Sequence, residues 1–560
     1  MKKQLLLMMV FSTVIFNGCT KLNEQILDET LTTSLSDRAA AEGLIAPVYA
    51  QLPDLFQHTT YFTLQEISTD EAILPYRGGT DWGDNGIYLQ MHSHNFSSTD
   101  PNIRGTWNTI TSSISRSINA INNLPALNDP SVKTFVAEAR GMRAYYSMLT
   151  LDLFGLVFVK DDPTKNSVIL RGNEALQYVI DEFLAAEPDL ETVPVTHGRL
   201  SKPAVWSLLA RLYLNAAVYR NIYADATFTG ADMDKVIEYC DKVIASNQYQ
   251  LSNDYFSIFD DENNTNKEII FAVDQRADLN GHNRMAYFSI SGDQYPLPEF
   301  PAANGTDGPA ITSDYYRTWV NAYAPADPSV DPRFYKENLS IYSHPADSCV
   351  PAADFNINRG ILRGQQYGLI RRNGVFLKCA SGQMKVDKLF YDTRNKPTLP
   401  VDFSEKVDFT VDGSNYNSGY RVEKYEFSRK SVSGRNFGEA DIVITRLADI
   451  YLMRAEAKLR KSNDAAGALA DVNLVRASRT STTPPPPLTS MTLDLLFRER
   501  GFEFYWEMLR RTDMIRFGKY EGTWTEKTNT DKQKRVFPIP QTAIDGASNI
   551  QGYLQQNASY

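Results

Sequence analysis

Apolar residues recur three and four positions apart over much of this chain, and that spacing predicts amphipathic α-helices. Residues 103–124 carry one such stripe, and residues 133–154 carry a second. Two helix starts are marked by capping residues, Ser201 before a Lys-Pro pair and Asp464 before an alanine-rich run. Further helices are predicted at about 36–51, 172–187, 202–220, 233–246, 441–461, 464–478 and 491–508. The chain is therefore expected to be mainly α.

The predicted helices follow one another in pairs with short connections, which favours a helical-repeat scaffold of the tetratricopeptide kind. The strict signature of that repeat is absent from the sequence. Residues 284–440 differ, because they are rich in Gly, Pro, Asn and Tyr and contain only short possible strands such as 367–370. This segment is predicted to be a long irregular insertion of loops and short strands. Loops on a rigid scaffold often carry binding residues.

The first nineteen residues have the anatomy of a secretory signal. Lysines precede an apolar run that ends at Gly18-Cys19 and is too short to span a bilayer. The end of the run resembles a bacterial lipobox, with Phe16 where leucine is usual. We therefore predict a signal peptide at 1–18, lipidation of Cys19, and a polar tether at 19–35 that holds the protein on a membrane surface outside the cytoplasm. The alternative is an ordinary cleaved signal in which Cys19 is incidental.

Charge and cysteine content narrow the possible partners. The chain holds 57 Lys and Arg against 67 Asp and Glu, a net charge of −10, which argues against nucleic acid and against adsorption to anionic lipid. A lipid anchor would then be needed to hold the protein at a membrane. Cys240 lies in a helical pattern and is predicted to be a buried thiol. Cys349 and Cys379 could pair in an exported protein, although nothing in the sequence fixes their separation.

Four blocks of sequence carry a family resemblance through their order and spacing. The first is 137–146 with Leu151-Asp152-Leu153-Phe154-Gly155, the second is 446–457 with 471–476, the third is 499–507 with 510–518, and the fourth is Phe537-Pro538-Ile539-Pro540 with 555–560. Together with the lipobox, they resemble the SusD/RagB family of Bacteroidetes outer-membrane lipoproteins over essentially the whole mature chain. In the first block, Val157-Phe158 replaces the Val-Pro step that is usual in the family.

The resemblance implies a SusD-like fold, with an N-terminal helical region at 36–283, a ligand-side insertion at 284–440 and a C-terminal helical region at 441–560. Family members are glycan- or nutrient-binding lipoproteins of the cell surface and are not enzymes. They deliver a captured oligomer to a TonB-dependent outer-membrane transporter of the SusC type. Their helical repeats pack on the transporter, and loops from the other side line the ligand cavity. A peptide cargo stays open, because the family includes peptide-capturing members.

Glu499, Glu503 and Glu507 recur every four residues with arginines close by, so they can pair with arginine on the same or a facing helix. The alternative is a surface glycoside hydrolase, whose two carboxylates would need a cleft and separate environments. The sequence contains no GxSxG, HExxH, P-loop, GxGxxG or CxxC motif. We therefore predict a binding protein without catalytic, metal or cofactor residues, although the acidic segment 260–264 leaves a calcium ion open.

The loop at 75–86, called the Trp82 loop below, concentrates the chemistry that sugars require. The indole of Trp82 can stack on the apolar face of a sugar ring. Polar side chains able to exchange hydrogen bonds with sugar hydroxyls flank it: Arg77, Asp81, Asp84 and Asn85. These features favour a glycan over a peptide as the cargo. The alternative is a glycine-rich turn in which Trp82 plugs a small core.

The insertion supplies a second set of candidate contacts. Ligand sites in the SusD/RagB family often draw aromatic side chains from this middle region. The resemblance therefore implies that Tyr295, Tyr315 and Trp319 contact the ligand.

Overall fold

The computed structural model describes residues 36–78, 82, 84–161, 164–276, 283–294, 304–338, 348–428 and 439–560. The predicted signal peptide, Cys19 and the tether lie outside these ranges, and so do Asp81 and Tyr295. Within the described ranges, no helix combines the length and the apolar character needed to cross a membrane.

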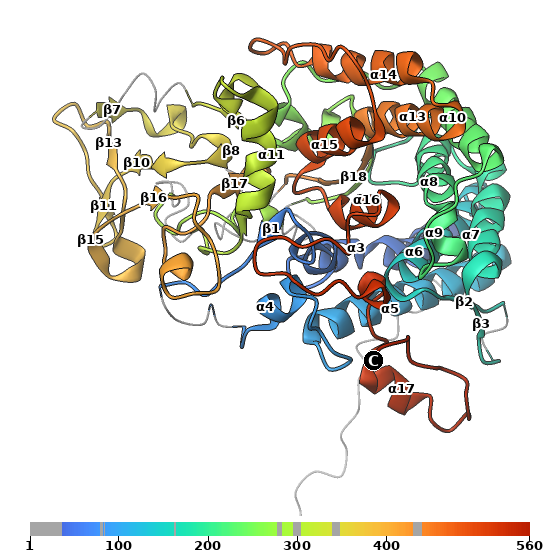
Figure 1. The fold of residues 1–560 in the computed structure, drawn as a ribbon. Helices are drawn as coiled ribbons and strands as arrows, with labels where there is room; N and C mark the ends of the chain where they lie inside the picture. Colours follow the sequence, from blue (N-terminus) through green and yellow to red (C-terminus); the bar gives the residue numbers. More distant parts are fainter. Residues whose placement is uncertain are drawn as a thin grey trace, which may run out of the picture.

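Long helices form a curved scaffold, at the right of Figure 1. They are α2 (Asp37–Tyr49), α5 (Pro101–Asn123), α6 (Val132–Phe154), α7 (Gly172–Ala186), α8 (Lys202–Leu214), α10 (Gly230–Ala245), α13 (Leu447–Ser462) and α14 (Ala465–Ser478). α2 packs against α5, α6 against α7, α8 against α10, and α13 against α14, while further contacts of α5 with α6 and of α10 with α13 join neighbouring pairs. The predicted mainly helical architecture is confirmed.

Capping residues fix where several of these helices begin. Ser201 and Asp464 each accept a backbone N–H from the first turn of α8 and α14, as predicted. The single helix predicted over 202–220 is instead two, α8 and α9 (Ala216–Arg220), with Asn215 between them. Asn215 bends the chain because its side-chain amide donates to the carbonyl of Arg211 one turn earlier.

The apolar stripe predicted on α5 faces the core. Ile103, Ile110 and Ile114 are buried, and Trp107 packs edge-on against Phe154 of α6 with 4.9 Å between ring centroids. α6 is buried on most of its surface, because α2, α5 and α7 all pack against it. Removal of these stripes from water is the main driving force for assembling the scaffold.

Two strands that flank the insertion in the sequence pair with each other next to the scaffold. β4 (Ile269–Val273) and β18 (Ile442–Arg446) pair antiparallel, and every residue of both strands is buried. The C-terminal helices therefore start from a fixed point beside α8, which packs against both strands. After α14 the chain adds α15 (Leu493–Phe504), α16 (Arg510–Arg516) and α17 (Gln541–Gly546).

The insertion folds into α11 (Ser313–Tyr323) and small antiparallel sheets, at the left of Figure 1. Its strands are β5 (Ala310–Ile311), β6 (Tyr335–Lys336), β7 (Ser348–Val350), β8 (Arg359–Leu362), β9 (Gly364–Gln365), β10 (Tyr367–Leu369), β11 (Arg371–Arg372), β12 (Val375–Phe376), β13 (Met384–Lys388), β14 (Phe390–Tyr391), β15 (Lys396–Pro400), β16 (Asp402–Phe403) and β17 (Arg421–Glu423). The three-stranded sheets have the orders β17-β8-β6 and β10-β13-β7.

Short elements near the N-terminus complete the fold. They are α3 (Leu52–Leu55), β1 (Ala72–Ile73), α4 (Ile87–His92), β2 (Val157–Val159) and β3 (Val168–Leu170). β1 pairs with β5, so the chain that leads into the Trp82 loop is joined to the insertion by backbone hydrogen bonds.

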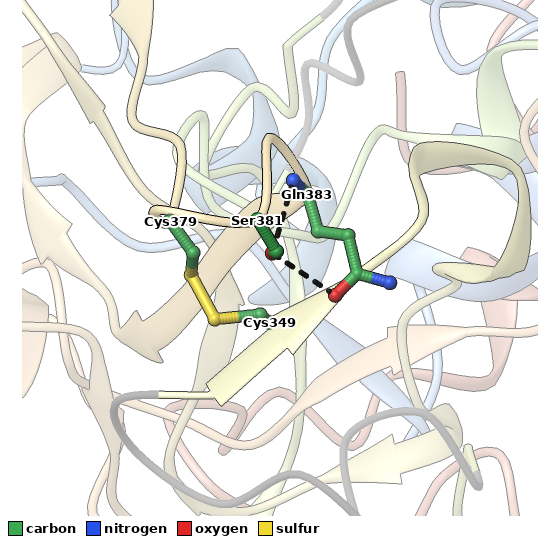
Figure 2. Close-up of a disulfide and its surroundings, with 4 residues drawn as sticks. All are labelled: Cys349, Cys379, Ser381 and Gln383. Carbon is green, nitrogen blue, oxygen red and sulfur yellow. Dashed lines mark hydrogen bonds between the residues drawn. A yellow bond between two sulfur atoms is a disulfide. The ribbon is translucent and has the colours of Figure 1, made fainter.

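A disulfide joins Cys349 in β7 to Cys379, in the loop before β13 (Figure 2). The pairing that the sequence left open is therefore present. The loop is further closed by Gln383, whose carbonyl accepts the N–H of Cys379 and whose Oε1 lies 3.3 Å from the hydroxyl of Ser381. Cys240 is a buried free thiol, as predicted.

The glutamates of α15 lie in a buried network of ion pairs. Glu503 accepts hydrogen bonds from Arg333, Arg446 and Arg479, which come from the insertion, the end of β18 and the end of α14. Glu499 and Glu507 extend the network through the same arginines and others. The three guanidinium groups hold the pKa of Glu503 well below its usual value despite burial. The predicted pairing of these carboxylates with arginine is confirmed.

Glu503→Gln tests how much this network contributes to the stability of the protein. The substitution keeps the size of the side chain and removes the charge that three buried guanidinium groups share. We expect the free energy of unfolding in urea to fall by about 3–5 kcal/mol. Glu42→Gln is the matched control, because Glu42 pairs with Arg38 in the open, and it should cost less than about 1 kcal/mol. Equal effects of the two substitutions would contradict the central role of Glu503.

Candidate ligand-binding site

Arg77 is buried and holds the Trp82 loop to the insertion. Its guanidinium donates to the backbone carbonyls of Asp307, Gly308 and Ser418 at 2.7–3.0 Å. Burial, together with the nearby Arg421 guanidinium, lowers the pKa of Arg77. The expectation that this side chain meets a ligand does not fit its position, because it faces inward and its donors are engaged with the backbone.

Trp82 is half-buried at the surface of the loop. Its indole N–H donates to the carbonyl of Thr306 at 2.9 Å, and its ring meets Tyr88 and Phe288 edge-on, with centroids 5.9 and 5.6 Å away. The indole is thus anchored by its polar end and one edge. This geometry has features of both sequence-based alternatives, since an anchored ring that stays partly exposed can still stack on a sugar.

The residues after Trp82 build the start of α4. Asp84 Oδ2 accepts the N–H of Tyr88 at 3.1 Å, and this N–H belongs to the first turn of α4, where no partner is available within the helix. Asn85 and Gly86 both have positive φ, the conformation of a tight turn that asparagine and glycine tolerate. Asn85 is exposed at this turn.

Tyr315 and Trp319 are buried in the core between α11 and α15. The hydroxyl of Tyr315 donates to the carbonyl of Gly501 at 2.7 Å, and the ring of Trp319 stacks on Phe502 with 3.7 Å between centroids. Neither side chain is available to a ligand, so their expected role as contacts is corrected. One turn of helix separates them, and this spacing places both on the apolar face of α11, which packs inward.

A cavity of about 940 Å³ lies in the insertion, between β10, β13, the β11–β12 hairpin and the short helical turn η10 (Asp392–Arg394). We call it the insertion cavity. The rings of Phe376 and Phe390 line it, and Phe390 is 36% exposed. Amide, hydroxyl and charged side chains surround these rings, among them Arg372, Asn373, Asp387, Lys388, Thr393 and Asn395. Its size and mixed lining are those of a small-molecule site.

The sequence did contain a signal for part of this cavity that was missed. Asn373 and Gly374 both have positive φ and connect β11 to β12, as an Asn-Gly pair does in a two-residue hairpin. The other walls come from β13 and η10, so the concavity arises from segments that touch only after folding.

Side-chain contacts connect the Trp82 loop to the wall of the insertion cavity. Thr393 of η10 lines the cavity, and its neighbour Arg394 pairs with Asp307 at 2.7 Å. Asp307 follows Thr306, whose carbonyl accepts the indole N–H of Trp82. The ring of Tyr416 covers Gly78 and lies 5.9 Å from the Arg394 guanidinium. A chain of contacts through Thr306, Asp307 and Arg394 therefore links the loop to the rim of the cavity.

Asp293 is one of the carboxylates that line the cavity. Burial raises the pKa of Asp293 to about 6, while the N–H and hydroxyl of Thr393 donate to its two oxygens. In the described part of the chain, no group of three or more His, Cys, Asp or Glu side chains is placed to hold a metal ion. In the acidic segment 260–264, Asp260 pairs with Arg359 and Asn263 donates to two backbone carbonyls.

Comparisons with known proteins agree on one family. The model of the SusD family matches residues 403–560. The starch-binding protein SusD of Bacteroides thetaiotaomicron is 26% identical over 524 residues, covering 90% of this chain and 86% of that protein. A laminarin-binding SusD-like protein has the same fold, with a TM-score of 0.64 at 17% identity, covering 94% of this chain and all of that one.

A further solved structure is surface glycan-binding protein A of Bacteroides thetaiotaomicron in complex with laminarihexaose. It matches with a TM-score of 0.64 at 20% identity and covers 93% of this chain and 100% of its own. The chain is therefore similar in sequence to the SusD family, through the model match at 403–560 and a relative that covers 90% of the chain, and it shares the fold of SusD-like proteins.

Proposed function

We propose that this protein captures an oligosaccharide in the insertion cavity and along the Trp82 loop, without cleaving it. The observation that carries the proposal is the cavity of about 940 Å³, in which two phenylalanine rings lie among amide and charged side chains. Sugars present an apolar face and a rim of hydroxyls, and such a lining can hold both.

Relatives support a glycan as the cargo. One is named a starch-binding protein, another binds laminarin, and a third was solved with laminarihexaose. The carboxylates of α15, which a hydrolase would need in a cleft, are buried in ion pairs with arginine, so they are not open to a substrate. A non-enzymatic role fits these contacts.

The proposal extends to delivery and location. We propose that Cys19 is lipidated, that the mature chain is held at the outer membrane, and that it passes its cargo to a SusC-like TonB-dependent transporter. The division into regions 36–283, 284–440 and 441–560 is part of the same proposal. The order of the lipobox and the family blocks in the sequence supports it, together with the family match.

Phe390→Ala tests the cavity as the sugar site. Loss of a stacked ring should weaken binding of a cognate oligosaccharide by about 1–2 kcal/mol, or five- to thirtyfold, in titration calorimetry. Val195→Ala serves as the control, because Val195 is 83% exposed and lies outside the cavity. Product analysis of the same samples checks for cleavage. Unchanged affinity, or release of shorter sugars, would contradict the proposal.

Trp82→Ala separates the two interpretations of the Trp82 loop. If the exposed part of the indole stacks on sugar, binding weakens by about 1–3 kcal/mol while the melting temperature changes little. If Trp82 only plugs the core beside Phe288, the variant melts at a lower temperature, and its folded fraction binds sugar as before.

Cys19→Ala tests the anchor. Without the thiol there is no acceptor for the lipid, and the variant should move from the membrane fraction to the soluble fraction of the cells that express it. Trp82→Ala, which leaves Cys19 intact, is the control for fractionation. A Cys19→Ala protein that stays with the membrane would refute lipidation at this residue.

A further inference from the structure

One segment of the insertion, residues 371–396, is positively charged although the chain as a whole is acidic. The whole protein has a net charge of −10. Residues 371–396 nevertheless hold seven cationic side chains and two carboxylates, a net charge of +5. The cations are Arg371, Arg372, Lys378, Lys385, Lys388, Arg394 and Lys396.

The fold concentrates these charges at the insertion cavity. Arg371 and Arg372 form β11, and Lys385 and Lys388 belong to β13. The N–H of Leu377 donates to the carbonyl of Ile370, and the N–H of Lys385 donates to the carbonyl of Leu377, so the hairpin and β13 are joined by backbone hydrogen bonds. All four cationic side chains line the cavity.

Three carboxylates also line the cavity, those of Asp293, Asp387 and Asp392, so the four cations outnumber them by one. Asp293 accepts hydrogen bonds from Thr393, and Asp387 accepts the backbone N–H of Lys388 at 2.7 Å. Arg372 and Lys388 are exposed, and neither has an ion-pair partner among the described residues. Several buried and half-buried arginines elsewhere are paired with carboxylates, as Arg140 and Arg143 are with Glu182. Arg372 and Lys388 therefore give this side of the cavity two exposed cations, and exposed cations at a concave site favour a negatively charged ligand.

The wall that carries the cations is held in place. The disulfide between Cys349 and Cys379 ties β7 to the loop between Leu377 and Lys385, both of which line the cavity (Figure 2). Pairing of β13 with both β10 and β7 fixes the other end of that loop. A wall fixed before binding reduces the entropy lost when a ligand is bound.

We infer that the sugar bound in the insertion cavity carries negatively charged groups, either carboxylates or sulfates. This inference rests on the proposed function and names the class of its cargo. The rings of Phe376 and Phe390 would contact the apolar faces of the sugar, while Arg372 and Lys388 contact its anionic groups. The planar guanidinium of arginine matches the two oxygens of a carboxylate or sulfate, and lysine provides a compact charge.

Calorimetry with matched oligosaccharides tests the inference. The chain from Thr20 onward, which contains every described residue, is titrated at 50 mM and 300 mM NaCl with a neutral β-glucan hexamer, an oligogalacturonate and a sulfated oligosaccharide of similar length. We expect one of the two anionic sugars to bind more tightly than the glucan, and its affinity to fall at the higher salt concentration. The anionic sugar that binds identifies the source of the charge.

A second experiment removes two of the cationic side chains that line the cavity. Arg372→Gln combined with Lys388→Gln should weaken the anionic sugar about tenfold. The control pair, Arg38→Gln with Lys235→Gln, removes two exposed cations from α2 and α10 and should leave binding unchanged.

Several outcomes would overturn the inference. Tighter binding of the neutral glucan, insensitive to Arg372→Gln and Lys388→Gln, would refute the anionic class while the proposed function stands. Binding of peptide mixtures but of no sugar would refute the proposed function itself. Capture of phosphatidylglycerol vesicles that depends on Arg372 and Lys388, without binding of anionic sugar, would assign the cluster to a lipid surface.

Discussion

The arrangement of this protein depends on the carboxylate of Glu503. It meets Arg333, Arg446 and Arg479, which the sequence places in the insertion, at the end of β18 and at the end of α14. Buried charges are costly unless each one is paired with good geometry. All of these ion pairs form together only when the three segments are arranged in this way. The network therefore fixes the position of the insertion relative to the helical scaffold.

The candidate site follows from this arrangement. α11 is fixed to α15 by Tyr315 and Trp319, and the Trp82 loop is fixed to the insertion by Arg77. These three side chains are buried and hold neighbouring elements together. Contacts with a ligand must therefore come from other residues, which lie at the surface. The residues left at the surface are the half-buried Trp82, the rings of the insertion cavity and the cations of β11 and β13.

Local patterns predicted the scaffold well. The stripe on α5 and the caps at Ser201 and Asp464 depend on neighbours within one turn, and all three are present. The four-residue spacing of the α15 glutamates predicted pairing with arginine, but it could not name Arg333, which lies 170 residues from Glu503.

The site was harder to predict, because side-chain direction decides it. Tyr315 and Trp319 have the chemistry of sugar contacts, but the apolar face of their helix points into the core. Arg77 has the chemistry of a hydroxyl donor, but its partners are backbone carbonyls more than 200 residues away. The insertion cavity forms from strands and turns whose pairing has no local signature beyond the Asn373-Gly374 hairpin.

The central claim is that the insertion cavity holds a sugar. A crystal structure of the chain from Thr20 onward, grown with an oligosaccharide that it binds in solution, tests this most directly. We expect sugar rings against Phe376 or Phe390, with Arg372 or Lys388 in contact with the ligand. Sugar bound elsewhere, for example in the groove lined by Tyr249, Tyr451 and Leu474, with an empty insertion cavity, would contradict it.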